Sequence, residues 1–168
     1  MSTTLAYIAL GSNQGDSPRT LRSAMDQLEN QSMRPLLRSS LWESTPVDCP
    51  PGSSIFLNAA VALEPLPGET PRSLLVKLQQ LEIEFGRQPK KVVNEPRPLD
   101  LDLIAFGREV LSLPHLILPH PRAHLRKFVL KPLKEIAPHL ILPGQHQTVA
   151  QLLEQLDNRE IVLRVGRA

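Results

Sequence analysis

The sequence has few of the features that mark secreted, membrane-spanning or nucleic-acid-binding proteins. It contains one cysteine, Cys49, which excludes an internal disulfide and favours a reducing compartment. The first apolar run, residues 5–10, is too short for a signal peptide or a membrane span, and no basic residue precedes it. The formal net charge of +2 is too close to balance to indicate a nucleic-acid partner. We therefore expect a cytoplasmic protein that binds neither membranes nor nucleic acids.

Length and composition indicate one folded domain, residues 1–168. A chain of 168 residues is long enough to bury a core of ordinary size. Apolar residues make up 41% and charged residues 21%, which fits a globular protein rather than a disordered one. The 17 prolines are well above the ordinary share of about 5%, so we expect long and stiff loops.

Leucine and aspartate alternate over residues 99–103, which is typical of a half-buried strand. Asp100 and Asp102 then lie on one face with their Cα atoms about 6.6 Å apart. Two carboxylates held side by side repel one another unless a cation lies between them. Oxygen ligands suit Mg²⁺, which takes one or two carboxylates and completes its shell with substrate phosphates. The alternative is a solvated edge strand with two exposed aspartates.

Hydrophobic periodicity predicts strands at residues 5–10, 36–44 and 55–64 and helices at residues 18–31 and 71–85. Ser17 and Thr70 are the expected N-caps, each followed by a proline, and Gly86 closes the second helix. With the strand at 99–104, the order is that of a ferredoxin-like α+β core. This core is a four-stranded antiparallel sheet with both helices on one face and the other face free for loops and ligand. Short helices, and a short strand at residues 161–165, follow as a C-terminal extension.

Two further features carry chemistry. Asn58 places an amide among apolar neighbours on its strand. It either makes a cross-strand hydrogen bond or forms a pocket floor that recognises the edge of a heterocycle. The loop at residues 87–97 is basic and leads directly to Asp100, so cations that can bind phosphate lie beside carboxylates that can bind Mg²⁺. The turn at residues 11–15 lacks the Lys-Ser/Thr ending of a P-loop.

Several short stretches occur together in a characteristic order and separation: residues 7–13, 56–61, 86–87, 96–102, 119–120 and Phe128. Together they resemble the 6-hydroxymethyl-7,8-dihydropterin pyrophosphokinase family of folate biosynthesis, over residues 5–143. The resemblance implies a ferredoxin-like core, ATP as co-substrate, two Mg²⁺ ions, and transfer of a diphosphoryl group to the pterin hydroxymethyl with release of AMP. The length matches the stand-alone form of the family, which we expect to be a monomer whose partners are its small-molecule substrates.

The resemblance also implies roles for individual residues. The metal-binding residues are Asp100 and Asp102, and the catalytic set adds Arg87 and Arg97. The pterin-binding residues are Thr45, Pro46, Val47, Phe56, Asn58 and Phe128. The ATP-binding residues are Gln79, Glu82, Arg87, Arg97, Leu103, His115, Ile117, His120 and Arg126.

The loop at residues 88–95 departs from the family pattern. Where the family usually carries an arginine, a basic residue, a tryptophan and a glycine, this chain has Pro89, Val93, Asn94 and Glu95. That loop normally folds over ATP. The departure leaves a second hypothesis open, in which the chain is a catalytically weakened paralogue that acts as a pterin- or nucleotide-binding module.

Overall fold

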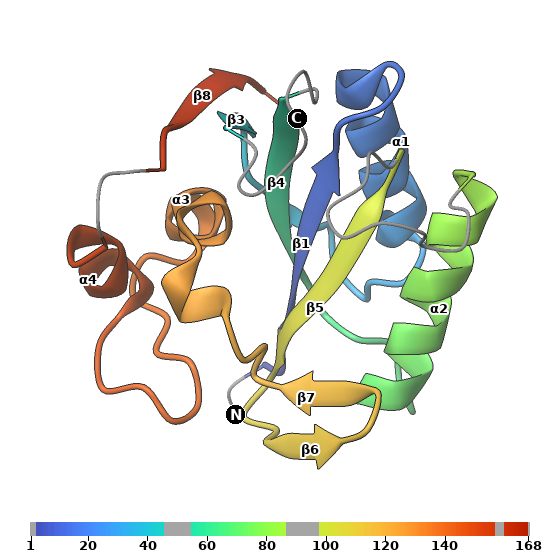
Figure 1. The fold of residues 1–168 in the computed structure, drawn as a ribbon. Helices are drawn as coiled ribbons and strands as arrows, with labels where there is room; N and C mark the ends of the chain where they lie inside the picture. The colour runs from blue at the N-terminus through green and yellow to red at the C-terminus, as the bar shows by residue number, and fades with distance from the viewer. Residues whose placement is uncertain (1–2, 46–54, 87–97, 157–159, 168) are drawn as a thin grey trace.

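The computed structural model describes residues 3–45, 55–86, 98–156 and 160–167. Within these ranges an antiparallel sheet forms the centre of the molecule, with helices on both faces (Figure 1). The strands lie across the sheet in the order β5 (Asp100–Phe106), β1 (Ala6–Ser12), β4 (Phe56–Leu63), β3 (Leu41–Ser44) and β8 (Val162–Gly166). A short strand, β2 (Leu37–Arg38), also pairs with β4.

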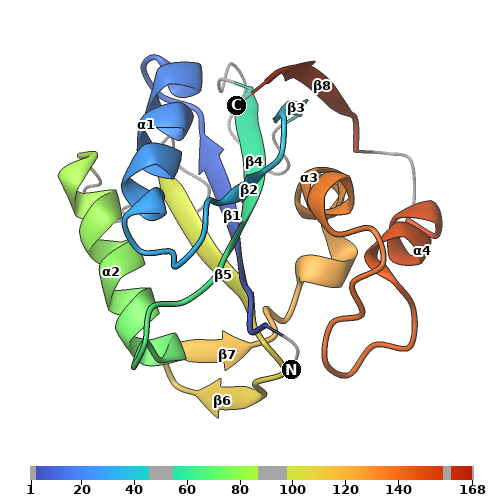
Figure 2. The same ribbon diagram turned by 180° about the vertical axis from the view of Figure 1, so that it is seen from behind.

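This arrangement confirms the predicted ferredoxin-like core. β1 pairs antiparallel with both β5 and β4, which places the last strand of the core beside the first. α1 (Ser17–Glu29) and α2 (Pro71–Glu84) lie together on one side of the sheet (Figures 1 and 2). The C-terminal extension contributes α3 (Lys127–Ile136), α4 (Val149–Glu154) and β8, which pairs with β3 and widens the sheet beyond the predicted four strands.

The predicted strand at residues 36–44 is interrupted. Arg38 pairs with Val61 and Trp42 pairs with Asn58, so three residues on one strand face two on the other. The extra residue makes a bulge around Ser39 and Ser40. Ser39 stabilises it, because its hydroxyl accepts a 2.8 Å hydrogen bond from the backbone N–H of Ala60. The alternation of side chains along a strand cannot reveal the inserted residue, because the segments on both sides of the bulge remain extended.

The helix boundaries follow local capping, with one correction. Thr70 caps α2 as predicted and forms a reciprocal capping box with Ser73. Ser17 is not the cap of α1: its hydroxyl accepts a hydrogen bond from Ser12, and the helix begins one residue early because Asp16 caps the N–H of Arg19. α1 also ends at Glu29, two residues before the predicted limit.

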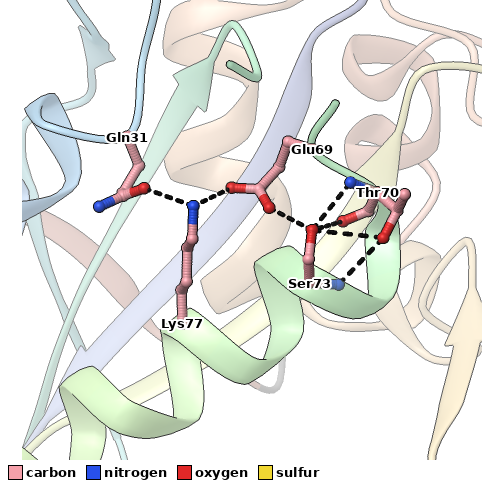
Figure 3. A network of polar contacts seen from close by, with 5 residues as sticks. All are labelled: Gln31, Glu69, Thr70, Ser73 and Lys77. Carbon is pink, nitrogen blue, oxygen red and sulfur yellow. Dashed lines mark hydrogen bonds and ion pairs between the residues drawn. The ribbon is translucent and has the colours of Figure 1, made fainter. Parts of the chain in front are cut away.

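A buried carboxylate ties the start of α2 to the chain after α1 (Figure 3). The side chain of Glu69 is only 3% exposed and accepts hydrogen bonds from Ser73 and from Nζ of Lys77, the latter at 2.7 Å. The same ammonium donates to the amide oxygen of Gln31 at 2.8 Å. Because the buried charge is paired and hydrogen-bonded, this contact stabilises the packing of the two helices.

The sheet buries apolar side chains on both of its faces. Beneath α1 and α2 the strands contribute Ile8, Leu10, Leu57, Val61, Leu101 and Leu103. The opposite face contributes Tyr7, Ala60, Ala62 and Ile104, which pack with Val129, Leu130 and Leu133 of α3 and with Val149 and Leu152 of α4. The prediction that this second face is free for loops and ligand is therefore wrong over much of its area, because its apolar residues require cover. The polar end of that face remains for a site.

A hairpin of β6 (Leu111–Leu113) and β7 (Leu116–Leu118) follows β5. Sequence analysis did not predict it, because each strand is three residues long and prolines flank the second. None of the helices that the structure describes is long and apolar enough to cross a membrane.

Candidate active site

Polar side chains gather at the end of the sheet where β1 finishes and β4 and β5 begin. Asp100 pairs with Gly11 of β1, and Gly11 pairs on its other side with Asn58 of β4. Residues opposite one another on antiparallel strands project to the same face, so Asp100 and Asn58 lie on one face, separated by a single strand. Asp102 shares this face because it is two residues further along β5. α3 packs on the same face.

Gly11 keeps the floor between these side chains open. A methyl group on Gly11 would lie 3.6 Å from Oδ1 of Asn58 and 4.0 Å from Cβ of Asp100. Alanine would therefore occupy the space between the amide and the carboxylate at ordinary van der Waals distances. A glycine inside an apolar strand often marks such a close approach. The sequence carries that signal, but Gly11 is not among the residues that the sequence predicts for the site.

Asp100 and Asp102 are both half-buried, whereas Leu101 between them is buried in the core. Oε2 of Glu82, on α2, accepts a 2.8 Å hydrogen bond from the N–H of Leu101. The anchor fixes β5 between the two aspartates, so their carboxylates are held on one side of a rigid strand. The structure thus confirms the predicted strand at this position and the shared face of Asp100 and Asp102.

The donor set fits Mg²⁺ better than a structural metal. Across residues 3–45, 55–86, 98–156 and 160–167, no three His, Cys, Asp or Glu side chains come together as a metal-binding group. Two carboxylates without a third protein ligand are typical of Mg²⁺, which retains water and takes phosphate oxygens. A closed zinc site needs four ligands, commonly cysteine or histidine. Asp100 and Asp102 supply the carboxylate oxygens that Mg²⁺ prefers and could hold such an ion.

His120 lies beside the aspartates as a neutral donor. Burial lowers its pKa to about 4, assisted by the charges of Arg126 and Arg122 and opposed by that of Asp100. Its backbone N–H donates to the carbonyl of Ile104 on β5 at 2.8 Å, and its Nδ1 accepts from the N–H of Arg122 at 3.1 Å. With Nδ1 as the acceptor, the neutral ring carries its proton on Nε2. It can donate to a phosphate oxygen without changing its charge.

Arg126, a predicted ATP-binding residue, lies next to Phe128, a predicted pterin-binding residue. The guanidinium of Arg126 lies 5.6 Å from the centroid of the Phe128 ring, within cation–π range. Phe128 belongs to the first turn of α3 and is half-buried against the core cluster on that face. The contact holds a cation beside an aromatic surface.

The Asn58 side chain is 4% exposed and makes the cross-strand hydrogen bonds that were one of its two interpretations. Its Nδ2 donates to the hydroxyl of Ser44 at 2.7 Å and to the carbonyl of Trp42 at 3.4 Å. These bonds orient the amide through its nitrogen, and its oxygen lies 3.6 Å from the position that a Cβ atom of Gly11 would take. The two interpretations are compatible, since an amide that is held by its nitrogen presents its oxygen in a defined direction.

Other predicted pterin residues lie near this end of the sheet. Thr45 is exposed directly after β3, and its N–H donates to the carbonyl of Ile161 at 3.3 Å. Phe56 is the first residue of β4, half-buried and paired with Ser44. The predicted residues Pro46, Val47, Arg87 and Arg97, and the loop at residues 88–95, lie outside the described residues.

The remaining predicted ATP residues are more dispersed. Gln79 is exposed on α2, and Glu82 accepts a hydrogen bond from the N–H of Leu101 on β5. Leu103 is 5% exposed in the core beneath the helices, so only its main chain could contact a ligand. His115 and Ile117 are exposed on the hairpin of β6 and β7, which packs against β5.

Sequence reasoning missed Trp42 and Glu135. Glu135 lies in the last turn of α3 and accepts hydrogen bonds from the bulge that precedes β3. Phe128, Lys131 and Glu135 follow helical spacing, which predicts a shared face. The spacing does not reveal which strand that face contacts.

Comparison with known proteins identifies one family that this chain resembles. The model of the family described as 7,8-dihydro-6-hydroxymethylpterin-pyrophosphokinase (HPPK) matches residues 7–138. A Bacillus subtilis protein named 2-amino-4-hydroxy-6-hydroxymethyldihydropteridine pyrophosphokinase is 42% identical over 133 residues, which cover 79% of this chain and 77% of that protein.

Longer proteins also contain the region. The Folic acid synthesis protein fol1 of Pneumocystis carinii is 35% identical over 159 residues, covering 92% of this chain but only 20% of that protein. A crystal structure of wild-type Plasmodium falciparum HPPK-DHPS with pteroate shares the fold at a TM-score of 0.71 and 14% identity, over 92% of this chain and 42% of that chain. This chain thus spans a fifth of the first of these proteins and less than half of the second.

Proposed function

The chain belongs to the 7,8-dihydro-6-hydroxymethylpterin-pyrophosphokinase family, and we propose that Asp100, Asp102 and Asn58 carry its reaction. As a family member it is a pyrophosphokinase with ATP as co-substrate. The reaction transfers a diphosphoryl group from ATP to the hydroxymethyl group of 6-hydroxymethyl-7,8-dihydropterin and releases AMP, in folate biosynthesis.

One observation carries the assignment of residues. Asp100, Gly11 and Asn58 are consecutive partners across three strands on the face that bears α3. The row places carboxylates suited to a metal–phosphate complex one strand away from an amide suited to a heterocycle. A diphosphoryl transfer requires this juxtaposition, because the phosphorus and the acceptor hydroxyl must be brought into line.

Asp100 and Asp102 would hold two Mg²⁺ ions together with the ATP phosphates. When bound, the ions supply neutralisation of phosphate charge and orientation of the reacting oxygens. Beside them, Arg126 neutralises further phosphate charge, and the neutral His120 donates from Nε2. Arg87 and Arg97 are proposed to complete this set of cations, on the resemblance of the sequence. No side chain is required to act as a general base in this account.

The pterin is held by complementary groups on β4 and α3. Asn58 directs its amide oxygen over Gly11 and recognises the ring edge, while Phe56 and Phe128 supply stacking surfaces. Thr45, Pro46 and Val47 are proposed as the remaining pterin contacts. A site that hydrogen-bonds its substrate rejects analogues without those groups, because its own polar groups would be left unpaired.

The test is formation of AMP from ATP. With 6-hydroxymethyl-7,8-dihydropterin and Mg²⁺, the purified chain should release AMP and form the pterin diphosphate. With 6-methyl-7,8-dihydropterin, which lacks the acceptor hydroxyl, it should bind pterin but release no AMP. ADP as the product, or AMP release that does not depend on the hydroxyl group, would overturn the assignment. The weakened binding module is not favoured, since its family relatives are pyrophosphokinases.

We further propose that the enzyme acts as a monomeric single domain in the cytoplasm. The single cysteine supports the cytoplasmic location, since it excludes an internal disulfide, and the length of 168 residues supports a single domain. Sedimentation velocity at micromolar concentration tests the oligomeric state directly.

A further inference from the structure

The face of α3 that begins with Phe128 also contacts the bulge before β3. Phe128, Lys131 and Glu135 are spaced i, i+3 and i+7 and share one helix face. At its far end, Oε1 of Glu135 accepts hydrogen bonds of 2.9 Å from the N–H of Ser40 and of 2.9 Å from Nε1 of Trp42. Its Oε2 accepts a 2.5 Å hydrogen bond from the Ser40 hydroxyl.

The bulge explains why Ser40 needs this partner. An inserted residue falls out of the ladder, so its N–H loses its cross-strand acceptor. Ser40 is 8% exposed, and an unsatisfied N–H there would be costly. Glu135 supplies the acceptor from a helix that lies 95 residues further along the chain. Burial opposes the charge, but hydrogen bonds from Ser40 and Trp42, together with the charge of Arg164, hold the pKa of Glu135 below its usual range.

Two side chains of α3 contact Trp42. Its indole N–H donates to Glu135, and Nζ of Lys131 lies 5.8 Å from the centroid of its ring. A cation over an aromatic face and a charge-assisted hydrogen bond both depend on orientation. Together they fix the angle and distance between α3 and β3.

The same strand orients Asn58. Trp42 is the cross-strand partner of Asn58, and the carbonyl of Trp42 and the hydroxyl of Ser44 both accept from the Asn58 amide. A displacement of β3 would therefore rotate or release that amide. Hydrogen bonds thus link α3, which carries Phe128, to Asn58 through β3.

We propose that Glu135 is a positioning residue for the pterin, which sets the separation of Phe128 and Asn58 by anchoring α3 to Ser40 and Trp42. It touches neither substrate and acts through β3. This inference rests on the proposed function, because it takes Phe128 and Asn58 as pterin contacts. It predicts that loss of the Glu135 contacts weakens binding of the pterin and leaves binding of ATP unchanged.

Three variants of the full chain test the proposal. Glu135→Gln removes the negative charge that strengthens all three hydrogen bonds, and its NH2 group can only donate to the Ser40 hydroxyl, which must then reverse its direction. Trp42→Phe keeps an aromatic ring but removes the indole N–H together with part of the ring system that Lys131 contacts. Lys77→Met is the matched control, since it breaks the contact with buried Glu69 on the opposite face of the sheet.

Calorimetry measures the Kd of 6-hydroxymethyl-7,8-dihydropterin and of a non-hydrolysable Mg²⁺–ATP analogue for each variant. For Glu135→Gln we expect the pterin Kd to rise about tenfold and that of the analogue to change by less than about twofold. Trp42→Phe should give a smaller rise in the pterin Kd. Lys77→Met should lower the melting temperature while leaving both Kd values unchanged. Trp42 is the only tryptophan of the chain, so a shift of its emission spectrum in Glu135→Gln, absent from Lys77→Met, reports the lost indole contact.

Equal weakening of both ligands in Glu135→Gln, or a wild-type pterin Kd in that variant, would overturn the proposal. A selective pterin loss in Lys77→Met would also overturn it, since destabilisation alone would then suffice. If Glu135→Gln does not fold, Trp42→Phe decides, and a wild-type pterin Kd there is the contrary result. A wild-type chain that binds no pterin overturns the proposed function and this inference with it, whereas a binding wild type with unaffected variants overturns the inference alone.

Discussion

The carboxylate of Glu82 accepts a 2.8 Å hydrogen bond from the N–H of Leu101, the residue that separates Asp100 from Asp102. Among the strands that the structure describes, β5 lies at an edge of the sheet, so this N–H has no neighbouring strand there to pair with. A helix on one face of the sheet thus holds the backbone of two aspartates whose side chains project to the other face. The predicted contact of Glu82 with ATP remains a prediction, beside this observed contact with the strand.

The first prediction concerns that anchor. Glu82→Ala should lower the free energy of unfolding by about 1–3 kcal/mol, because the N–H of Leu101 is buried without its acceptor. It should also weaken Mg²⁺-dependent turnover, since the aspartates lose their support. Glu82→Gln keeps an oxygen acceptor and should restore most of both. Urea unfolding and AMP release measure the two effects, and equal losses in both variants would point to the charge instead of the hydrogen bond.

The metal assignment gives the second prediction. Asp100→Asn and Asp102→Asn should each lower turnover by orders of magnitude, because each removes a charge that binds Mg²⁺. Thermal stability should be equal to or above that of the wild type, since repulsion between the carboxylates is relieved. Asp26→Asn, on the exposed surface of α1, is the matched control and should leave turnover unchanged. Near-normal AMP release in both site variants would contradict the assignment.

The third prediction separates the two substrates at the pterin contacts. Asn58→Ala and Phe128→Ala should weaken pterin binding far more than binding of an ATP analogue, through lost hydrogen bonding and lost stacking respectively. Ser44→Ala removes the 2.7 Å partner of the Asn58 amide and should give a weaker effect in the same direction. Calorimetry measures the Kd of each ligand in each variant. An equal rise in the Kd of the pterin and of the ATP analogue would show that the pterin pocket lies elsewhere.

The fourth prediction concerns acid pH. The pKa of His120 falls to about 4 in the folded chain from an ordinary value of 6.5. Between these values the unfolded chain binds the additional proton, so the stability of the ligand-free protein should decrease as pH falls from about 6.5 to about 4. His120→Gln keeps a side-chain N–H donor but does not titrate. The stability difference between wild type and His120→Gln should therefore shrink at low pH, and urea unfolding at pH 7 and pH 5 checks it. A constant difference would show that the ring is not buried in its neutral form.

The fifth prediction concerns the loop at residues 88–95. Lys90 and Lys91 could bind phosphate only as point charges, whereas a guanidinium binds phosphate in a bidentate manner and an indole excludes water. Pro89→Arg, Asn94→Trp and Glu95→Gly together restore the usual family pattern. The combined variant should speed single-turnover chemistry more than it tightens ATP binding. An unchanged or lower rate with both substrates saturating would show that this chain compensates for the loop elsewhere.

Local patterns in the sequence were sufficient for most of the elements and for the shared face of Asp100 and Asp102. The alternation of leucine and aspartate placed Asp100 and Asp102 on one face of a strand, because the period of a strand is a property of its own backbone. Thr70 was recognised as a cap for the same reason, since its partner Ser73 lies three residues away. The order of these elements led to the ferredoxin-like core. The short stretches that carry the resemblance led to the family.

Tertiary structure alone decided which of these residues meet. The register that sets Asp100, Gly11 and Asn58 in one row depends on how three strands align, and no single strand contains that information. The contact of Glu135 with Ser40 joins residues 95 apart, across a bulge that periodicity does not reveal. The cover of the second face by α3 followed from the need to bury its apolar residues, which depends on the whole sheet. Local conformation was readable from local sequence because neighbouring residues determine it, whereas the arrangement of the site required the packing of distant segments.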